Sequence, residues 1–212
     1  MFDTASLAIF ITAALALLLA PGPAVLYIVA RSLEQGRMAG LISALGIGLA
    51  GIVHVVFAAL GLSALLMQSA LAFSVVKYLG AAYLIYLGIR TLTHKARASK
   101  VQGIEVMTYP KIFSQGFIVN LLNPKTALFF LAFLPQFVDP ARASVVPQIV
   151  VLGMIFVGLA IVSDSLYALV AGTARQLLAG NVFVVRVQKY LAGTIYIILG
   201  ITTAFAGDSR AK

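Results

Sequence analysis

Six long apolar segments constrain the fold of this chain more than any other feature. They lie at residues 4–30, 39–67, 70–92, 115–137, 146–172 and 187–206. Each reaches the roughly 20 residues that a helix needs to cross about 30 Å of hydrocarbon at about 1.5 Å per residue. Because lipid offers no hydrogen-bond partners to an open backbone, such segments must be helical. The sequence therefore predicts an all-α integral membrane protein of six transmembrane helices, with a single transporter-like domain over residues 1–212.

Composition supports a membrane location. Hydrophobic residues make up 62% of the chain and charged residues 10%, whereas about a quarter of an ordinary globular domain is charged. The net charge of +9 would suggest a nucleic-acid partner in a soluble domain. Here the basic residues fall between the apolar segments, which indicates a lipid bilayer with anionic head groups as the partner and no nucleic acid. The chain has no cysteine, so disulfide and thiolate chemistry are excluded.

The basic residues also predict an orientation. Ten of them lie in the connections after the first, third and fifth segments, and four lie on the other side. Basic loops stay in the cytoplasm, so both termini are expected outside, and the polar stretch 93–114 is expected to be a cytoplasmic linker. If one segment were re-entrant, the C-terminus would be cytoplasmic instead. The first segment has no basic residues before it and is too long for a signal peptide, so we expect it to be retained.

An internal repeat divides the chain into halves. Residues 77–89 match residues 189–201 at seven of 13 positions. Shared membrane-helix composition explains matching Leu, Ile and Gly but not the shared Lys-Tyr-Leu that opens both stretches. Repeat one then covers about residues 4–92 and repeat two about 115–206. Because each half has three spans, the halves run in opposite directions, which is the inverted-repeat plan of many secondary transporters.

Proline interrupts the first segment of each half at a corresponding place. Pro21, Gly22 and Pro23 lie in the first apolar segment, and Pro124 lies in the fourth. A proline has no backbone N–H to donate to the preceding turn, and irregular backbone at membrane depth is tolerated where it lines a cavity. Two broken helices at matched positions are a strong sequence indication of a transport site. A single such proline would more simply be a kink for packing.

The breaks should free both kinds of backbone group for a ligand. The carbonyls of Leu17, Leu19 and Asn120 lose their helical donors to proline. The half-helices that begin after each break turn free N–H groups and a positive dipole end toward the cavity, which suits a carboxylate. Freed carbonyls suit an ammonium group. The pattern is thus typical of a site for a zwitterionic amino acid.

Two charges lie at a similar depth. Lys125 and Asp164 are both far from the ends of their apolar segments, and a charge at the helix centre costs at least about 2.5 kcal/mol. Our hypothesis is that Lys125, Asn123 and the backbone at Gly22 receive the substrate carboxylate, while Asp164 receives the ammonium group or a coupling proton. The alternative is a salt bridge that only fixes helix packing.

Further polar residues complete the candidate set. Asn120 lies one turn before Pro124 and is expected to face the cavity, and Tyr167 either caps Asp164 or packs. His54 either relays protons or forms a hydrogen bond between helices. Selectivity for the substrate side chain is expected around Tyr27, Phe129 and Tyr167. The predicted substrate-binding residues are Pro21, Gly22, Pro23, Asn120, Asn123, Pro124, Lys125, Asp164 and Tyr167, and the predicted proton-coupling residues are Asp164 and His54.

The motifs together resemble a known family. "APGP" in the first segment, "VKYLGAAYLIYLGIR" in the third, "NLLNPK" in the fourth and a lone aspartate in the fifth are similar to the LysE/RhtB family of bacterial amino-acid exporters, of homoserine, threonine and lysine efflux type. The resemblance covers about residues 5–205. It implies a multi-pass inner-membrane exporter of amino acids or close derivatives, driven by the proton motive force as an antiporter, with no cofactor. The oligomeric state is open, and a homo-oligomer is compatible with the sequence.

Two other classes fit the residues less well. A divalent metal-ion exporter of similar architecture would need several intramembrane carboxylates or histidines as ligands, and Lys125 opposes the passage of cations, so no metal site is predicted. An intramembrane enzyme would need a nucleophile with a base, or paired acids. Asp164 and His54 lie in different segments, so the chain is not expected to be an enzyme.

Overall fold

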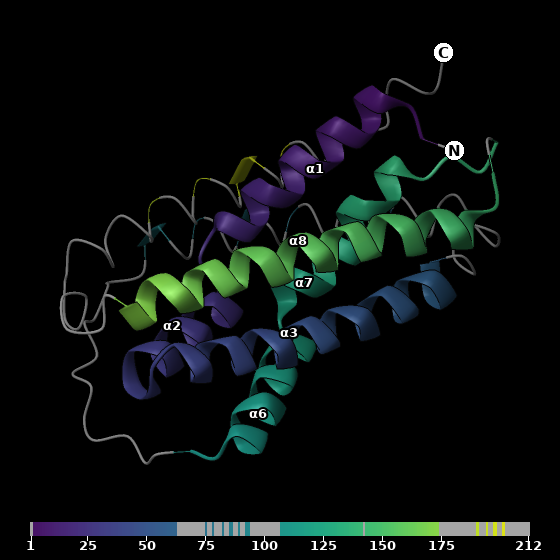
Figure 1. Ribbon diagram of the computed structural model, residues 1–212. Coiled ribbons are helices and arrows are strands. Elements are labelled where there is room, and N and C mark those ends of the chain that lie inside the picture. The colour runs from purple at the N-terminus through teal and green to yellow at the C-terminus, as the bar shows by residue number, and fades with distance from the viewer. Residues whose placement is uncertain are drawn as a thin grey trace.

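Helix is the only regular secondary structure in the described part of the chain. The computed structural model describes residues 2–62, 107–141 and 143–173, together with scattered positions between 75 and 93 and between 190 and 201. Within these ranges every element is a helix (Figure 1). The third and sixth apolar segments, and with them the repeat between residues 77–89 and 189–201, lie outside the continuously described residues. The six-helix inverted repeat therefore stays a prediction.

The first apolar segment forms two helices joined at the predicted break. α1 (Thr4–Leu19) begins after Asp3, whose carboxylate accepts a 2.7 Å hydrogen bond from the backbone N–H of Ser6. α2 (Pro23–Gln35) begins with proline at its first turn, where no helical donor is needed. The two helices are bent by 51° at the break. The proline and glycine residues thus divide one apolar segment into two half-helices, as the sequence predicted.

The fourth apolar segment is broken in the same way. α6 (Tyr109–Leu121) is followed by α7 (Pro124–Leu128) and by the short helical turns η2 (Phe129–Phe133) and η3 (Leu134–Phe137), with a bend of 45° at the break. α6 begins at Tyr109, inside the stretch 93–114 that the sequence had assigned to the linker. Proline in its first turn accounts for this early start, because that position suits proline.

Two further helices are unbroken. α3 (Arg37–Phe57) continues into the turn η1 (Ala58–Leu62), and α8 runs over Val145–Thr173. The residues 37–61 and 145–173 are each long and apolar enough to cross a membrane, and the two bent pairs raise the number of candidate spans in the described residues to four. On α8, the exposed side chains of Val162, Leu166 and Val170 recur at every fourth position, which places them on one face of the helix. An apolar face of this kind suits contact with lipid or with another apolar helix.

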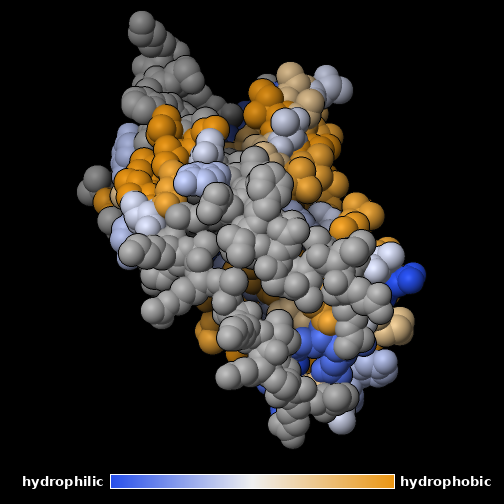
Figure 2. Space-filling model, turned by 90° about the vertical axis from the view of Figure 1, so that its left-hand side faces the viewer, coloured by the Kyte–Doolittle hydropathy of each residue, from blue (hydrophilic) through white to orange (hydrophobic). Residues whose placement is uncertain are grey.

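α3 packs against α2, α6 and α8, and Figure 1 shows it running beside α8 with α6 crossing below. Glycine makes the α3–α6 crossing close: a Cβ atom on Gly46 would collide with the carbonyl of Phe113, and one on Gly116 would lie 2.8 Å from the carbonyl oxygen of Ser43. Small residues at such crossings let helix backbones approach in membranes. Figure 2 shows hydrophobic residues over much of the upper part of the visible face, with the most strongly hydrophilic ones in its lower right part.

Candidate functional site

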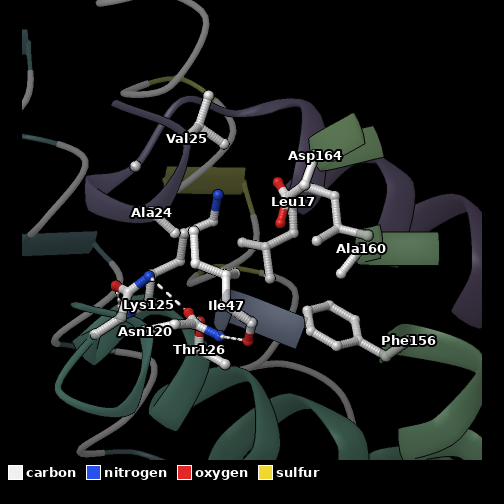
Figure 3. A pocket seen from close by; sticks show the side chains of 13 residues that line it. Leu17, Ala24, Val25, Ile47, Asn120, Lys125, Thr126, Phe156, Ala160 and Asp164 are labelled. Atoms are coloured by element: carbon white, nitrogen blue, oxygen red, sulfur yellow. Dashed lines mark hydrogen bonds between the residues drawn. The ribbon is translucent and has the colours of Figure 1, made fainter. Parts of the chain in front are cut away.

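A cavity lies between the two helix breaks. Its walls come from the end of α1, the start of α2, the middle of α3, the α6–α7 junction and α8 (Figure 3). Its volume is about 30 Å³. Since one water needs about 10–15 Å³, the cavity is narrow in this conformation. The lining residues are Leu17, Leu18, Gly22, Ala24, Val25, Ile47, Asn120, Asn123, Lys125, Thr126, Phe156, Ala160 and Asp164.

At the first break, the carbonyls that proline frees find new donors. The Leu17 carbonyl accepts from the backbone N–H of Ala20 at 3.1 Å, and the Leu19 carbonyl accepts from the Tyr167 hydroxyl at 2.8 Å. The Ala20 carbonyl accepts from Lys125 Nζ at 2.5 Å. A carbonyl of the broken helix therefore does bind an ammonium group, as the sequence suggested for a ligand. That ammonium group belongs to the side chain of Lys125.

At the second break, Asn120 is the centre of a buried hydrogen-bond network. Its carbonyl accepts from the backbone N–H of Asn123 and from His54 Nε2, both at 3.1 Å. Its side-chain Nδ2 donates to the Ile47 carbonyl at 2.9 Å, and its Oδ1 accepts from the Thr126 hydroxyl at 2.8 Å. Buried polar groups connected in this way stabilise one arrangement of the backbone. Asn120 thus fastens the broken helix to α3.

Two buried charges of opposite sign share the cavity. The exposed fraction is 7% for Lys125 and 3% for Asp164, and the two interact electrostatically. Figure 3 shows their side chains entering the cavity from different sides, Lys125 from α7 and Asp164 from α8. When Asp164 is ionised, its charge and that of Lys125 compensate each other in surroundings that would otherwise make either one costly.

The start of α2 adds a partial positive charge. Gly22 is its N-cap and gives no side-chain hydrogen bond to the first turn, and Gly22, Ala24 and Val25 all line the cavity. The first N–H groups of a 13-residue helix have no partner within the helix and favour an anion. The cavity therefore has a cationic side, at Lys125 and the α2 terminus, and an anionic side at Asp164.

The structure brings together five of the predicted site residues. Gly22, Asn120, Asn123, Lys125 and Asp164 all line the cavity. They come from three stretches that are far apart in the sequence: the break between α1 and α2, residues 120–125 at the second break, and α8. The prediction that the two breaks and the lone aspartate of the fifth segment lie near one another agrees with this arrangement.

The other predicted residues are not among those that line the cavity. Pro21, Pro23 and Pro124 shape the breaks, and Pro23 is exposed. Tyr167 neither caps Asp164 nor simply packs, because its hydroxyl donates to the broken end of α1. His54 forms the bond between helices that was one of its two expected roles, and its ring stacks on an aromatic ring at a centroid distance of 5.9 Å.

Sequence reasoning missed most of the apolar lining. Phe156, Ala160 and Asp164 follow one another at intervals of four, and so lie on one face of α8. That spacing was the sequence signal that could have found them, because it places Ala160 one turn and Phe156 two turns from the predicted aspartate on the same face of the helix. Thr126, next to the predicted lysine, was also missed.

The expected selectivity residues lie elsewhere. The Tyr27 hydroxyl donates to the Ile112 carbonyl at 3.0 Å, and Phe129 is buried in an aromatic cluster with Phe10, Phe133 and Phe156. Neither lines the cavity. In the ranges that the structure describes, no group of three His, Cys, Asp or Glu residues could hold a metal ion.

Comparisons with known proteins place the chain in a family. The model of the LysE type translocator family matches residues 15–207. An uncharacterized membrane protein of Vibrio cholerae is 33% identical over 189 residues, which cover 89% of this chain and 91% of that protein. An uncharacterized membrane protein of Bacillus subtilis is 30% identical over 210 residues, 95% of this chain and 99% of that protein.

A relative with a named activity matches over a shorter stretch. The leucine efflux protein of Salmonella choleraesuis is 34% identical over 134 residues, which cover 61% of this chain and 62% of that protein. No solved structure matches the chain. The family match confirms the resemblance that the sequence motifs had suggested.

Proposed function

Because this chain belongs to the LysE type translocator family, whose members are membrane transporters and not enzymes, we propose that it exports amino acids or close derivatives across the bacterial inner membrane. The leucine efflux protein among its relatives supports an amino acid as the substrate. The apolar helices make it a multi-pass membrane protein. The six-helix inverted repeat, with both termini outside, belongs to the same proposal.

The observation that carries the proposal is the meeting of both helix breaks and two opposite charges at one cavity. An amino acid has a carboxylate and an ammonium group a few ångströms apart. The carboxylate binds Lys125, Asn123 and the start of α2 at Gly22, and the ammonium group binds Asp164. Lys125 has three donors, so it can keep its bond to the Ala20 carbonyl while it binds the substrate.

Proton coupling follows from the same geometry. Asp164 releases a proton when the substrate ammonium group arrives and takes up a proton when the substrate leaves, which gives antiport through one carboxyl group. His54 hydrogen-bonds the carbonyl of Asn120 and is the second candidate for proton movement.

Binding requires the cavity to widen. It is narrow in this conformation, and the helices that form it are bent by 51° and 45° at their breaks. Breaks of a few residues are where transporters change helix angles around a fixed site. Opening to one side of the membrane and then to the other moves the half-helices α2 and α7 about these breaks.

The proposal is tested in proteoliposomes with a panel of labelled amino acids, by counterflow against preloaded amino acid and by uptake under an imposed proton gradient. We expect both kinds of uptake for at least one amino acid, and we expect the uptake driven by the proton gradient to be abolished in Asp164→Asn. Ser163→Ala is the matched control, because Ser163 is buried beside Asp164 and donates to the Ala160 carbonyl at 3.1 Å but does not line the cavity. Undiminished proton-coupled export by Asp164→Asn would show that the aspartate is structural.

A further inference from the structure

The cavity has a polar half and an apolar half. The charged and amide groups gather at the α6–α7 junction, at the start of α2 and at Asp164. The remaining walls come from α1, α3 and α8 and carry no polar side chain: Leu17, Leu18, Ile47, Phe156 and Ala160. Figure 3 shows Asp164, Ala160 and Phe156 in series along α8, on one side of the cavity. The apolar half therefore begins next to the aspartate.

The spacing along α8 gives this half a length. Ala160 lies one turn, about 6 Å, from Asp164, and Phe156 lies about 12 Å from it. From standard bond lengths, the terminal methyl groups of leucine lie about 5 Å from its ammonium nitrogen. A substrate whose ammonium group binds Asp164 therefore places such a side chain at the level of Ala160, with the Phe156 ring beyond it.

Phe156 is held rigidly in place. Its ring stacks on Phe129 at a centroid distance of 4.0 Å and meets the edge of Phe130 at 5.4 Å. Rings packed in this way move little, because the interior is close-packed. The far end of the apolar half is thus a fixed wall, whereas Ala160 has the smallest side chain in this half and takes up the least room.

The residues that line the cavity offer no further charge to pair with a charged side chain of the substrate. Lys125 and Asp164 are the ionisable residues among those that line it, and the proposed function assigns both to the main chain of the substrate. A lysine or glutamate side chain would then be buried without a partner, which is costly. The lining near Phe156 is apolar and favours hydrocarbon.

We propose, on the basis of the proposed function, that Phe156 and Ala160 set the length and bulk of the side chain that this exporter accepts, and that its substrates are neutral amino acids with aliphatic side chains. Phe156 is the end wall and Ala160 provides the width. Neither residue touches the carboxylate or the ammonium group.

The first test removes the end wall. In Phe156→Ala, export of methionine and phenylalanine relative to leucine should rise about tenfold or more. The reason is that room for a few more methylene groups in an apolar pocket changes the preference between substrates by that factor. Phe133→Ala is the matched control: Phe133 is 4% exposed, as Phe156 is, and also stacks on Phe129, but it does not line the cavity. Phe133→Ala should lower the melting temperature about as much as Phe156→Ala does, and it should leave the order in which the amino acids are exported unchanged.

The second test narrows the pocket. In Ala160→Leu, leucine export should fall about tenfold or more, while alanine export should persist. Ala171→Leu adds the same volume at a buried position of α8 that does not line the cavity, and should change no ranking. Equal loss of alanine and leucine export in Ala160→Leu, or unchanged rankings in both Ala160→Leu and Phe156→Ala, would overturn the inference while leaving the proposed function intact.

A binding measurement separates the two proposals. Amino acids that bind should raise the melting temperature of the purified wild-type protein, leucine more than lysine or glutamate, and Phe156→Ala should shift that order toward methionine. If this order is found without any transport, the proposed function fails and the side-chain pocket stands. If lysine or glutamate stabilises the protein more than leucine does, the pocket assignment is wrong.

Discussion

Replacing Lys125 by methionine tests whether the two buried charges depend on each other. Methionine keeps the unbranched shape and most of the length of the side chain, and removes its charge together with the 2.5 Å bond to the Ala20 carbonyl. Hydrogen bonds to charged groups contribute about 1.5–3 kcal/mol. At a pH high enough to ionise Asp164 without substrate, the larger effect is on Asp164, because a buried charge that loses its partner destabilises a protein by about 3–5 kcal/mol. We therefore expect Lys125→Met to lower the free energy of unfolding by about 3–5 kcal/mol.

The double variant gives the sharper result. Lys125→Met with Asp164→Leu removes both charges and leaves apolar groups of similar size, a change that is often neutral or even stabilising. Its free energy of unfolding should lie within about 2 kcal/mol of the wild type, so the coupling between the two sites exceeds about 2 kcal/mol. Thr126→Val is the control, since Thr126 is as buried as Lys125 and loses one uncharged bond. It should cost about 1 kcal/mol and add to Asp164→Leu without coupling.

The assay is reversible unfolding in mixed micelles, followed by far-ultraviolet circular dichroism because the chain has no tryptophan. The reasoning is refuted if Lys125→Met and Asp164→Leu are simply additive. Additivity would mean that the two side chains do not compensate each other across the cavity.

Three further predictions concern the helix break, the α3–α6 crossing and the orientation. Tyr167→Phe removes the hydroxyl bond at the end of α1 and should cost about 0.5–1.5 kcal/mol in the same unfolding assay, because the bond is exposed. A smaller loss than in Phe156→Ala is expected, and no loss would show that water replaces the hydroxyl. Gly46→Val should abolish accumulation of folded protein in membranes, as judged by size-exclusion chromatography, whereas Gly158→Ala, with open space around it, should not. Because the chain lacks cysteine, Ala141→Cys should react with an impermeant maleimide on intact spheroplasts, and Lys111→Cys only after lysis; the reverse pattern would invert the orientation.

The broken helices were predictable because proline acts locally. A residue without an N–H interrupts a helix wherever it lies, so the two breaks and the half-helices after them could be located from sequence. The start of α6 at Tyr109 lies before the apolar segment begins, and the sequence signal for it was Pro110, which suits the first turn of a helix.

The partners of the freed carbonyls could not be predicted in the same way. Lys125 and Tyr167 reach the end of α1 from 105 and 148 residues away, and such contacts depend on how the helices pack. The charges themselves were evident, since a lysine or an aspartate inside an apolar segment is rare without a function. The apolar lining was not, because Leu17, Ile47 and Phe156 are ordinary residues of membrane helices until the packing selects them.

The most direct test of the central claim, that this cavity holds the substrate, is photolabelling with a diazirine analogue of leucine. Irradiation of the purified protein and mass spectrometry of its peptides should place the label on Leu17, Leu18, Ile47, Phe156 or Ala160, and excess leucine should compete it away. Loss of this labelling in Asp164→Asn but not in Ser163→Ala would tie it to the proposed ammonium site. Labelling confined to exposed faces such as that of Val162, Leu166 and Val170, with no competition by leucine, would contradict the account.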